Sequence, residues 1–391
     1  MLRSLYSGIS GLRSHQEMLD VTGNNIANVN TVGFKASSTV FQDTLSQMTQ
    51  GAGGPQTGIG GTNPAQIGLG VQVAGVSTNF AQGSAQATGK ATDLMISGDG
   101  FFVTRLGNDT IYSRAGAFDF DANGRLVSAD GKIVQGYSAT NGVVNDGGQL
   151  TDIVLPLDAA APATATSSAT VTGNLPSDTA VGETLNRDAT VFDQNGSKHT
   201  LSLAYTRTTN GWSVTASNGQ GTSATGAITF AADGSVASGG TLAVGGITVD
   251  MTQLSGFAAL NTASISSQNG HEAGSLQGYS ISKDGTVVGT FSNGSSLAIG
   301  RIALATFANP AGLEKTGASG YRATANSGQA TVGAPGSAGV GSLASGTLEM
   351  SNVDLSQEFT NLIVAQRGFQ ANARIITTSD EVLQELTNLK R

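Results

Sequence analysis

The 391-residue sequence contains no cysteine, which excludes disulfide bonds, thiolate metal sites and cysteine nucleophiles. Charge is also scarce, because 19 Lys and Arg and 27 Asp and Glu give a net charge of −8 without any basic block. Binding of nucleic acid through phosphate neutralisation is therefore not expected. No run approaches the ~20 apolar residues of a membrane span, and the first residues lack the apolar core of a secretory signal. We expect neither membrane insertion nor a cleaved signal peptide.

Small residues and turn signals dominate what is present. The chain has 55 glycines and only 7 prolines, and its length suits two or three domains. Short apolar runs alternate with Asn-Gly or Asp-Gly pairs, which is typical of β-hairpins. Four segments show this pattern: FDFDANGRLV (118–127), VFDQNGSKHTLSLAY (191–205), ITFAADGSVA (228–237) and YSISKDGTVVGTFSNG (279–294).

The two ends of the chain have a different, helical pattern. Large apolar residues recur there at spacings of three and four, the pattern of a coiled-coil seam. The first stripe is Leu2, Leu5, Ile9, Leu12, Gln16, Leu19 and Ile26, and the second is Leu355, Phe359, Leu362, Gln366, Phe369, Ala373, Ile376, Asp380, Leu383, Leu386 and Leu389. Asp354 and Gln357 form a possible capping box, and Lys390 and Arg391 suit the C-terminal end of a helix dipole. We expect the terminal helices to pair.

These patterns predict an α+β, mainly β protein with discontinuous, nested β domains and a coiled-coil-like terminal helical domain. Its expected parts are a terminal helical domain (1–30 and 355–391), a connecting segment (31–70), an inner β domain (71–145 and 281–354) and an inserted outer β domain (146–280). The glycine-rich stretch 53–63 is expected to be a flexible connection.

The end of the first helix, NNIANVNTVGFK (24–35), is unusually rich in amides. Asparagine tolerates left-handed geometry at a helix end and can both donate and accept hydrogen bonds. Two interpretations remain open on physical grounds: a packed, uncharged interface, or a simple solvated helix stop. Pairing of the terminal helices covers one stripe of each, so we further hypothesise that the termini fold only when neighbouring copies complete their core.

The same stretch resembles the N-terminal signature of bacterial flagellar rod and hook proteins. Residues 63–103, 307–321 and 345–391 resemble further parts of that family, and 191–217 is similar to an outer domain of its hook-type members. The insert near 146–280 favours a hook-type member over the shorter rod proteins. The remaining alternatives are a distal rod protein and a secreted β-rich adhesin.

The resemblance implies a non-enzymatic structural polymer outside the cell. Its copies would form a flexible curved tube that transmits torque from rod to filament and encloses an export channel. Implied partners are other copies of the chain, the distal rod, hook cap and hook–filament junction proteins, and the flagellar export apparatus. The expected polymerisation interface comprises Leu2, Leu5, Ile9, Leu12, Leu19, Asn24, Asn25, Asn28, Asn30, Phe34, Leu355, Phe359, Leu362, Phe369, Asn372, Ile376, Leu383 and Leu386.

Motifs for other chemistry are weak, and we expect no catalytic, cofactor-binding or metal-binding residue. Residues 119–130 match most of a calcium loop, but their strand-like flanks favour a hairpin turn. Ser280 to Lys283 and Lys315 to Gly317 imitate penicillin-binding motifs in a strand context. The three histidines lack partners at metal-ligand spacing, and Trp212 is expected in a domain core.

Overall fold

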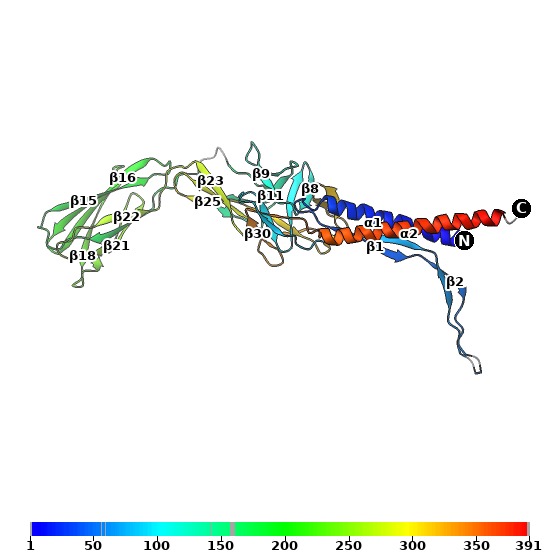
Figure 1. Ribbon diagram of the computed structural model, residues 1–391. Coiled ribbons are helices and arrows are strands. Elements are labelled where there is room, and N and C mark those ends of the chain that lie inside the picture. The colour runs from blue at the N-terminus through cyan, green and yellow to red at the C-terminus, as the bar shows by residue number, and fades with distance from the viewer. Residues whose placement is uncertain (1, 56, 59, 141, 157–160, 389–391) are drawn as a thin grey trace. The chain divides into compact units, whose positions relative to one another are not determined.

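The computed structural model describes residues 2–55, 57–58, 60–140, 142–156 and 161–388 (Figure 1). It is mainly β with one long helix at each end, which confirms the fold class predicted from the sequence. The chain forms two compact units. Unit 1 contains Met1–Leu155, Ser280–Val287 and Ala298–Arg391, and unit 2 contains Pro156–Tyr279 and Val288–Leu297. The four-part division expected above stays a prediction.

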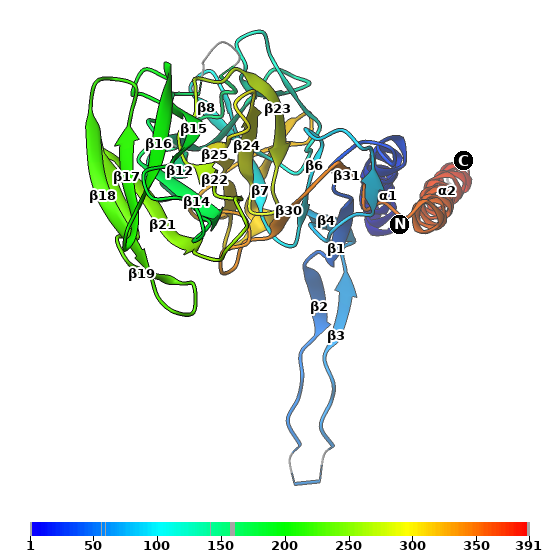
Figure 2. The ribbon, with the colours of Figure 1, turned by 90° about the vertical axis from the view of Figure 1, so that its left-hand side faces the viewer.

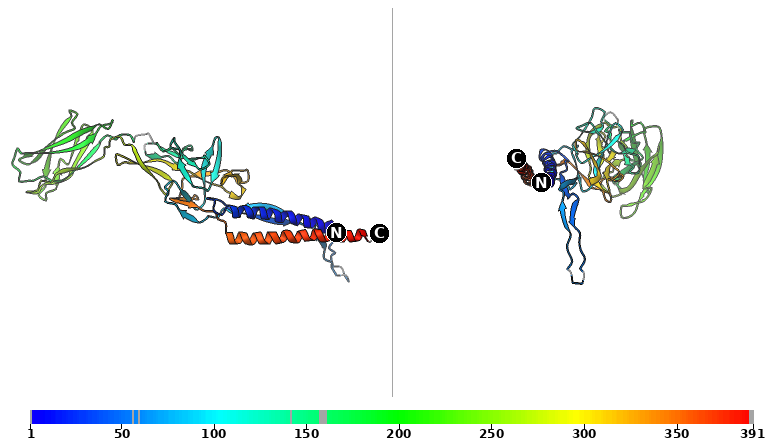
Figure 3. Two further views of the ribbon diagram at one scale, coloured as in Figure 1. Left: turned by 45° about the horizontal axis from the view of Figure 1, so that its top comes forward. Right: turned by 90° about the vertical axis from the view of Figure 1, so that its right-hand side faces the viewer.

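Helices α1 (Leu2–Ala27) and α2 (Leu355–Asn388) lie side by side in unit 1 (Figures 1 and 3). They are antiparallel, because Gly8 lies against Ile375 while Asn25 reaches Glu358. Asp354 caps α2, its Oδ1 accepting from the backbone N–H groups of Ser356 and Gln357. The Gln357 side chain donates to Asn361, four residues on, so only half of the expected capping box is observed. Leu389, Lys390 and Arg391 lie outside the described residues.

The segment after α1 forms two antiparallel hairpins. Strands β1 (Ser37–Asp43) and β4 (Val71–Thr78) pair beside α1, where the Val71 N–H donates to Ser10 Oγ. Strands β2 (Ser46–Gln50) and β3 (Ala65–Gly68) continue this ladder as a two-stranded arm (Figure 2). An isolated bridge between Gly53 and Thr62 extends the pairing into the glycine-rich stretch expected to be a flexible connection.

The main sheet has fourteen strands. Its central order is β23 (Leu276–Ile281), β24 (Thr286–Phe291), β25 (Ser296–Ile302), β11 (Ile133–Thr140), β7 (Phe101–Leu106), β8 (Asp109–Ser113), β28 (Gly320–Arg322) and β27 (Glu314–Gly317). Branching from it are β9 (Phe118–Phe120), β10 (Leu126–Ser128), β12 (Val143–Val144), β13 (Thr151–Asp152), β26 (Leu304–Thr306) and β29 (Thr331–Gly333). Two small sheets pair β5 (Ala85–Ala87) with β31 (Thr347–Glu349) and β6 (Leu94–Ser97) with β30 (Ser342–Ser345). A 3₁₀ turn, η1, spans Pro310–Gly312.

Alternating apolar residues of these strands build two clusters in unit 1. One surrounds Phe102, Phe118 and Leu304. The other is an aromatic cluster around Phe101 and Tyr321, whose rings meet edge to face. This geometry is the favoured one for aromatic pairs.

Unit 2 is a sandwich of two sheets. The first sheet has the order β20 (Thr241–Val244), β21 (Ile247–Ser255), β14 (Ser168–Asn174) and β22 (Ser264–Gln268), and the second β15 (Thr184–Phe192), β16 (Lys198–Thr208), β17 (Gly211–Ser217), β18 (Ser223–Phe230) and β19 (Val236–Ser238). Residues from both sheets form one core, in which Trp212 is almost fully buried as predicted.

The predicted turns are confirmed by the strands on either side of them. The calcium-like stretch is the turn between β9 and β10: Asp121 Oδ1 accepts from the backbone N–H groups of Asn123 and Arg125, and Gly124 has φ +74°. The first penicillin-binding look-alike spans the end of β23 and its turn, and the second lies in β27. Among the described residues there is no group of three potential metal-binding side chains. Neither described helix combines the length and apolarity that a membrane span requires.

Candidate assembly surface

Small and polar residues form the contact between α1 and α2. A Cβ atom at Gly11 would lie 2.6 Å from Asn372 Oδ1, and one at Gly368 would lie 2.5 Å from His15 Cε1. The two helices therefore approach more closely than side chains at these positions would allow. The α1 residues in this contact have the same spacing of three and four as the apolar stripe expected from the sequence. They are Gly8, Gly11 and His15, and each lies one residue before a stripe position.

This one-residue offset rotates the α1 stripe partly out of the helix contact, whereas the α2 stripe residue Ile376 still lies 3.6 Å from the Cβ position of Gly8. One residue corresponds to a rotation of about 100° around a helix. Helix pairing was predicted, but the seam differs from the expected leucine stripe. The reason is steric, because glycines permit a close approach that leucines would prevent.

The expected interface residues keep much of their apolar surface uncovered. Leu355, Phe359, Phe369 and Leu386 of α2 are 37 to 48% exposed. The half-buried members are Leu5, Ile9, Leu12, Leu19, Asn28, Phe34, Leu362, Asn372, Ile376 and Leu383, whereas Asn24 and Asn30 are exposed. The side chain of Leu2 lies outside the described part of the structure. The α2 stripe thus presents apolar surface that this single chain does not cover, whereas the described large apolar residues of the α1 stripe are half-buried.

Asn25 alone among the four asparagines is buried, at 1% exposure. Its Nδ2 donates to Ser37 O at 2.7 Å and to Glu358 Oε1 at 3.1 Å, and its Oδ1 accepts from the Ser37 N–H. Asn28 instead donates to the Asn24 carbonyl, which closes the helix end locally. Asn28 thus acts as a local helix stop, whereas Asn25 is buried within the chain beside the Glu358 carboxylate, and an interface at this stretch stays a prediction. Asn25 ties the end of α1 to β1 and to the first turn of α2.

A buried ion cluster lies directly after this tie. Lys35 Nζ donates to Glu349 Oε1 at 2.6 Å and to the Ala81 carbonyl at 2.7 Å, and neither Lys35 nor Glu349 exposes its side chain. Arg114 Nη1 lies 3.4 Å from Glu349 Oε2. Burial lowers the pKa of Lys35, an effect that its hydrogen bond to Glu349 opposes.

Backbone groups complete the cluster and fix the loop that carries Lys35. The Gly83 N–H donates to Glu349 Oε1 at 2.9 Å, and the Gly33 N–H donates to the Glu349 carbonyl at 2.8 Å. Gly33 has φ +67°, and a Cβ there would lie 2.5 Å from the Ala115 nitrogen, so only glycine fits. The cluster joins the segment after α1 to the segment before α2.

Sequence reasoning missed Lys35, Arg114, Glu349 and Glu358 as parts of this centre. The available signal was weak: Lys35 ends the amide-rich stretch, and Glu349 is a rare charge in the apolar segment before α2. No local pattern could reveal these pairs, because their members lie far apart in the sequence. Lys35 and Glu349 are 314 residues apart, and Asn25 and Glu358 are 333 residues apart.

The hairpins beside α1 add further exposed apolar side chains. Every residue of β2 and β3 is exposed. Large apolar side chains that remain at least partly open on these hairpins are Val40, Phe41, Leu45, Met48, Ile67, Leu69 and Val76. Apolar side chains exposed in this number along two neighbouring hairpins are consistent with a protein–protein contact.

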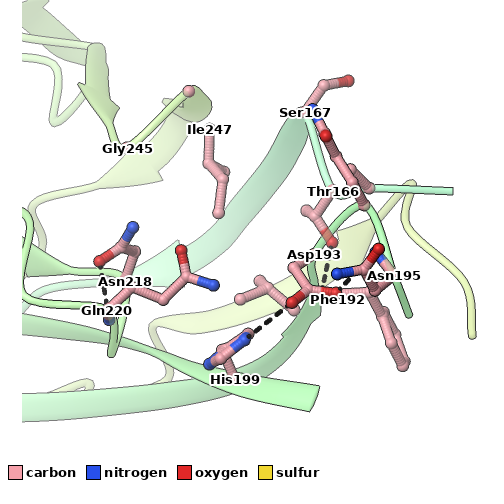
Figure 4. A pocket seen from close by; sticks show the side chains of 14 residues that line it. Thr166, Ser167, Phe192, Asp193, Asn195, His199, Asn218, Gln220, Gly245 and Ile247 are labelled. Carbon is pink, nitrogen blue, oxygen red and sulfur yellow. Dashed lines mark hydrogen bonds and ion pairs between the residues drawn. The ribbon is translucent and has the colours of Figure 1, made fainter. Parts of the chain in front are cut away.

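Unit 2 contains a separate polar pocket of about 470 Å³ (Figure 4). His199 Nε2 lies 3.4 Å from Asp193 Oδ2 at its edge, and the Gln220 side chain points into it. The backbone N–H of Ser197 holds the pKa of Asp193 below its usual value, with the His199 contact acting in the same direction. This pair has no third group that would complete a nucleophilic or metal-binding set among its described neighbours.

Three family models match parts of the chain. Residues 5–35 match a model described as flagella basal body rod protein, and residues 95–172 match the D1 domain of flagellar hook protein FlgE/F/G. Residues 344–389 match the C-terminal part of flagellar basal body rod FlgEFG proteins. The matches include both helices of the candidate surface.

Individual proteins match over the whole chain. The flagellar hook protein FlgE of Borreliella burgdorferi is 39% identical, with 100% of both chains covered. The flagellar hook protein FlgE of Salmonella typhimurium is 36% identical, covering 99% of this chain and 100% of the relative. The flagellar basal-body rod protein FlgG of Bacillus subtilis is 36% identical, with 100% of both chains covered.

Proposed function

Because the chain belongs to the flagellar hook and rod protein family (FlgE/F/G) and is a structural subunit of the hook, we propose that its copies polymerise through the apolar stripes of α1 and α2. In this proposal the copies form a flexible curved tube that transmits torque from rod to filament and surrounds an export channel. The hook is part of the flagellum outside the cell, and its family is structural rather than enzymatic.

The uncovered apolar stripes carry this proposal. Four α2 stripe residues are at least 37% exposed although the helix already has a partner in α1. Each large apolar side chain gains ~1.5–3 kcal/mol on full burial, so neighbouring helix pairs would be strongly attracted to this surface. Asn25 joins α1 to β1 and α2, and the Lys35–Glu349 pair joins the segment after α1 to β31. In this proposal these buried contacts transmit force between the helices and the strands beside them.

The family also suggests specific neighbours at the two ends of the tube and during export. We propose contacts with the distal rod, hook cap and hook–filament junction proteins, and passage through the flagellar export apparatus without a cleaved signal peptide.

Electron microscopy of the purified chain under polymerising conditions tests the proposal. We expect short curved tubes that are lost when residues 1–30 are deleted. The double variant Phe359→Ser/Phe369→Ser should raise the concentration needed for assembly by about tenfold or more, because two exposed stripe residues lose their apolar contacts. Leu106→Ser, at a β7 position that is 50% exposed, is the matched control and should assemble normally. A chain that stays monomeric at every concentration would contradict the proposal.

A further inference from the structure

The polar pocket of unit 2 has a volume of about 470 Å³ and takes no part in the polymer contacts proposed above (Figure 4). Turns from both sheets of the sandwich line it. The turns between β15 and β16 and between β17 and β18 come from one sheet, and the turn between β20 and β21 comes from the other. A cavity of this size falls in the range of small-molecule sites. The side chains held by these turns therefore decide which ligand fits.

Asn218 supplies a hydrogen-bond donor that the fold itself does not use. The residue is 5% exposed, and its Oδ1 accepts from the backbone N–H groups of Gln220 and Thr222 at 3.0 and 3.2 Å. Its Nδ2 has no hydrogen-bond partner among the residues that the structure describes. A Cβ atom at Gly245 would collide with this Nδ2, so glycine leaves the amide its place. Because buried polar groups are normally bonded, an unused donor in a pocket wall points to a ligand.

Two further polar groups of the pocket retain hydrogen-bonding capacity. The Gln220 carboxamide points into the cavity and makes no hydrogen bond to the described part of the chain (Figure 4). Asp193 uses Oδ1 to accept from the N–H groups of Asn195 and Ser197, whereas its Oδ2 lies 3.4 Å from His199 Nε2. That distance is long for a hydrogen bond, so Oδ2 can still accept another. The pocket thus offers a donor, an amide that both donates and accepts, and a carboxylate acceptor.

This set of groups favours a neutral, hydroxyl-rich ligand. A hydroxyl group both donates and accepts, which suits amides that lie beside a carboxylate. An anion is disfavoured, because the described lining contains the Asp193 carboxylate and neither lysine nor arginine. An apolar ligand would leave Asn218 Nδ2 and the Gln220 amide desolvated without partners, which is costly. Saccharides are the common biological compounds that combine neutrality with many hydroxyl groups.

We propose that this pocket binds a neutral saccharide. Asn218 Nδ2 donates to one hydroxyl, the Gln220 carboxamide bonds a second, and Asp193 Oδ2 accepts from a third. Hydrolysis of a glycoside uses two carboxyl groups, and the described lining contains one, so the site binds the saccharide without cleaving it. The site goes beyond the proposed function and does not depend on it, because it lies within one unit of a single chain.

Saturation-transfer difference nuclear magnetic resonance on the dilute full-length chain tests the site. The neutral probes are the methyl glycosides of glucose, galactose, mannose and N-acetylglucosamine, together with maltose and cellobiose. Glucuronic acid is the anionic probe. We expect saturation transfer to at least one neutral saccharide, and weaker transfer to glucuronic acid. Transfer to none of the neutral probes, or stronger transfer to glucuronic acid than to all of them, would overturn the inference.

Two substitutions locate the binding. Asn218→Asp keeps the oxygen that accepts from Gln220 and Thr222 and replaces only the unused Nδ2 donor. It should raise the Kd for the bound saccharide by about tenfold, as expected for the loss of one well-placed hydrogen bond. Gln220→Ala removes an exposed side chain that forms no bond in the described fold, and it should weaken binding by a similar factor.

Asn210→Asp is the matched control, because it makes the same chemical change at an exposed turn outside the pocket. This variant should bind the saccharide as the parent does. Melting temperatures equal to that of Asn210→Asp show that the pocket variants keep their fold. Unchanged binding in Asn218→Asp and Gln220→Ala, or an equal loss in Asn210→Asp, would show that the saccharide binds elsewhere and would overturn the inference.

Discussion

At the scale of single residues, burial separates side chains that look equivalent in the sequence. Four asparagines crowd the end of α1, but only Asn25 is buried and bonded to distant elements. Lys35 looks like an ordinary end to a polar stretch, yet it is fully buried against Glu349. Charged side chains are almost never fully buried unless they are paired. Loss of either partner of the Lys35–Glu349 pair would therefore leave a buried charge without its closest counterion.

Lys35→Met should destabilise unit 1 by about 3–5 kcal/mol, because it leaves Glu349 buried without its closest cation. Thermal melting followed by circular dichroism measures this loss. Lys90→Met is the matched control, since the Lys90–Asp119 pair is largely exposed and such pairs contribute at most ~1 kcal/mol. Equal losses in the two variants would mean that the buried cluster is not a structural centre.

Asp121 gives a pH-dependent prediction. The backbone N–H and the side chain of Arg125 hold the pKa of Asp121 below its ordinary value of 3.8. Because the pKa in the folded state is the lower one, the stabilisation is present above pH 3.8 and is lost as the pH falls through the lowered value. Nuclear magnetic resonance should show the Asn123 and Arg125 amides opening in this acidic range and not between pH 5 and 7. Asp121→Asn should remove the transition.

At the scale of secondary structure elements, local sequence patterns correctly predicted that the two helices and the hairpins exist. The helices follow from apolar spacing, and the hairpins follow from Asn-Gly and Asp-Gly turns, both of which depend on neighbouring residues. The face that each helix turns to its partner did not follow. Leucine stripes suggested the seam, but glycines at positions 8, 11 and 368 lie in the helix contact, and part of the α2 stripe remains exposed.

Gly368→Ala tests this seam, because its new methyl group would meet the His15 ring. We expect the substitution to lower the melting temperature of assembled tubes, with overpacking costing ~1–3 kcal/mol. His15→Ala in the same chain should restore most of the loss by making room. The matched control is Gly23→Ala in α1, where nothing lies within 4 Å, and it should stabilise the helix by up to ~1 kcal/mol. Destabilisation by Gly23→Ala as well would point to a helix-wide effect rather than to the seam.

At the scale of the whole molecule, the two terminal helices pair with each other and still leave apolar side chains of α2 uncovered. The contact between α1 and α2 combines small and polar residues with Ile375 and Ile376, whereas Leu355, Phe359 and Leu386 of α2 remain exposed. Fixing each residue of a helix costs ~1–2 kcal/mol in backbone entropy. The prediction that the termini order fully only in the assembly therefore remains consistent with this distribution of side chains.

Hydrogen exchange on dilute monomer and on tubes measures this coupling. Amides of residues 2–25 should exchange rapidly in the monomer and become protected in tubes, since only neighbouring copies cover the stripes. Core amides of β17, such as that of Val214, should be slow in both states because their burial lies within one chain. Strong protection of residues 2–25 in the dilute monomer would contradict the prediction.

The sequence by itself determined the element types, the fold class and the family, because spacing, turn residues and motif resemblance are properties of contiguous residues. Only the tertiary structure decided which asparagine is buried, which carboxylates pair with Lys35 and which face of each helix forms the seam. Those outcomes depend on groups separated by hundreds of residues, and on how closely two backbones approach. No local pattern of side chains encodes that distance.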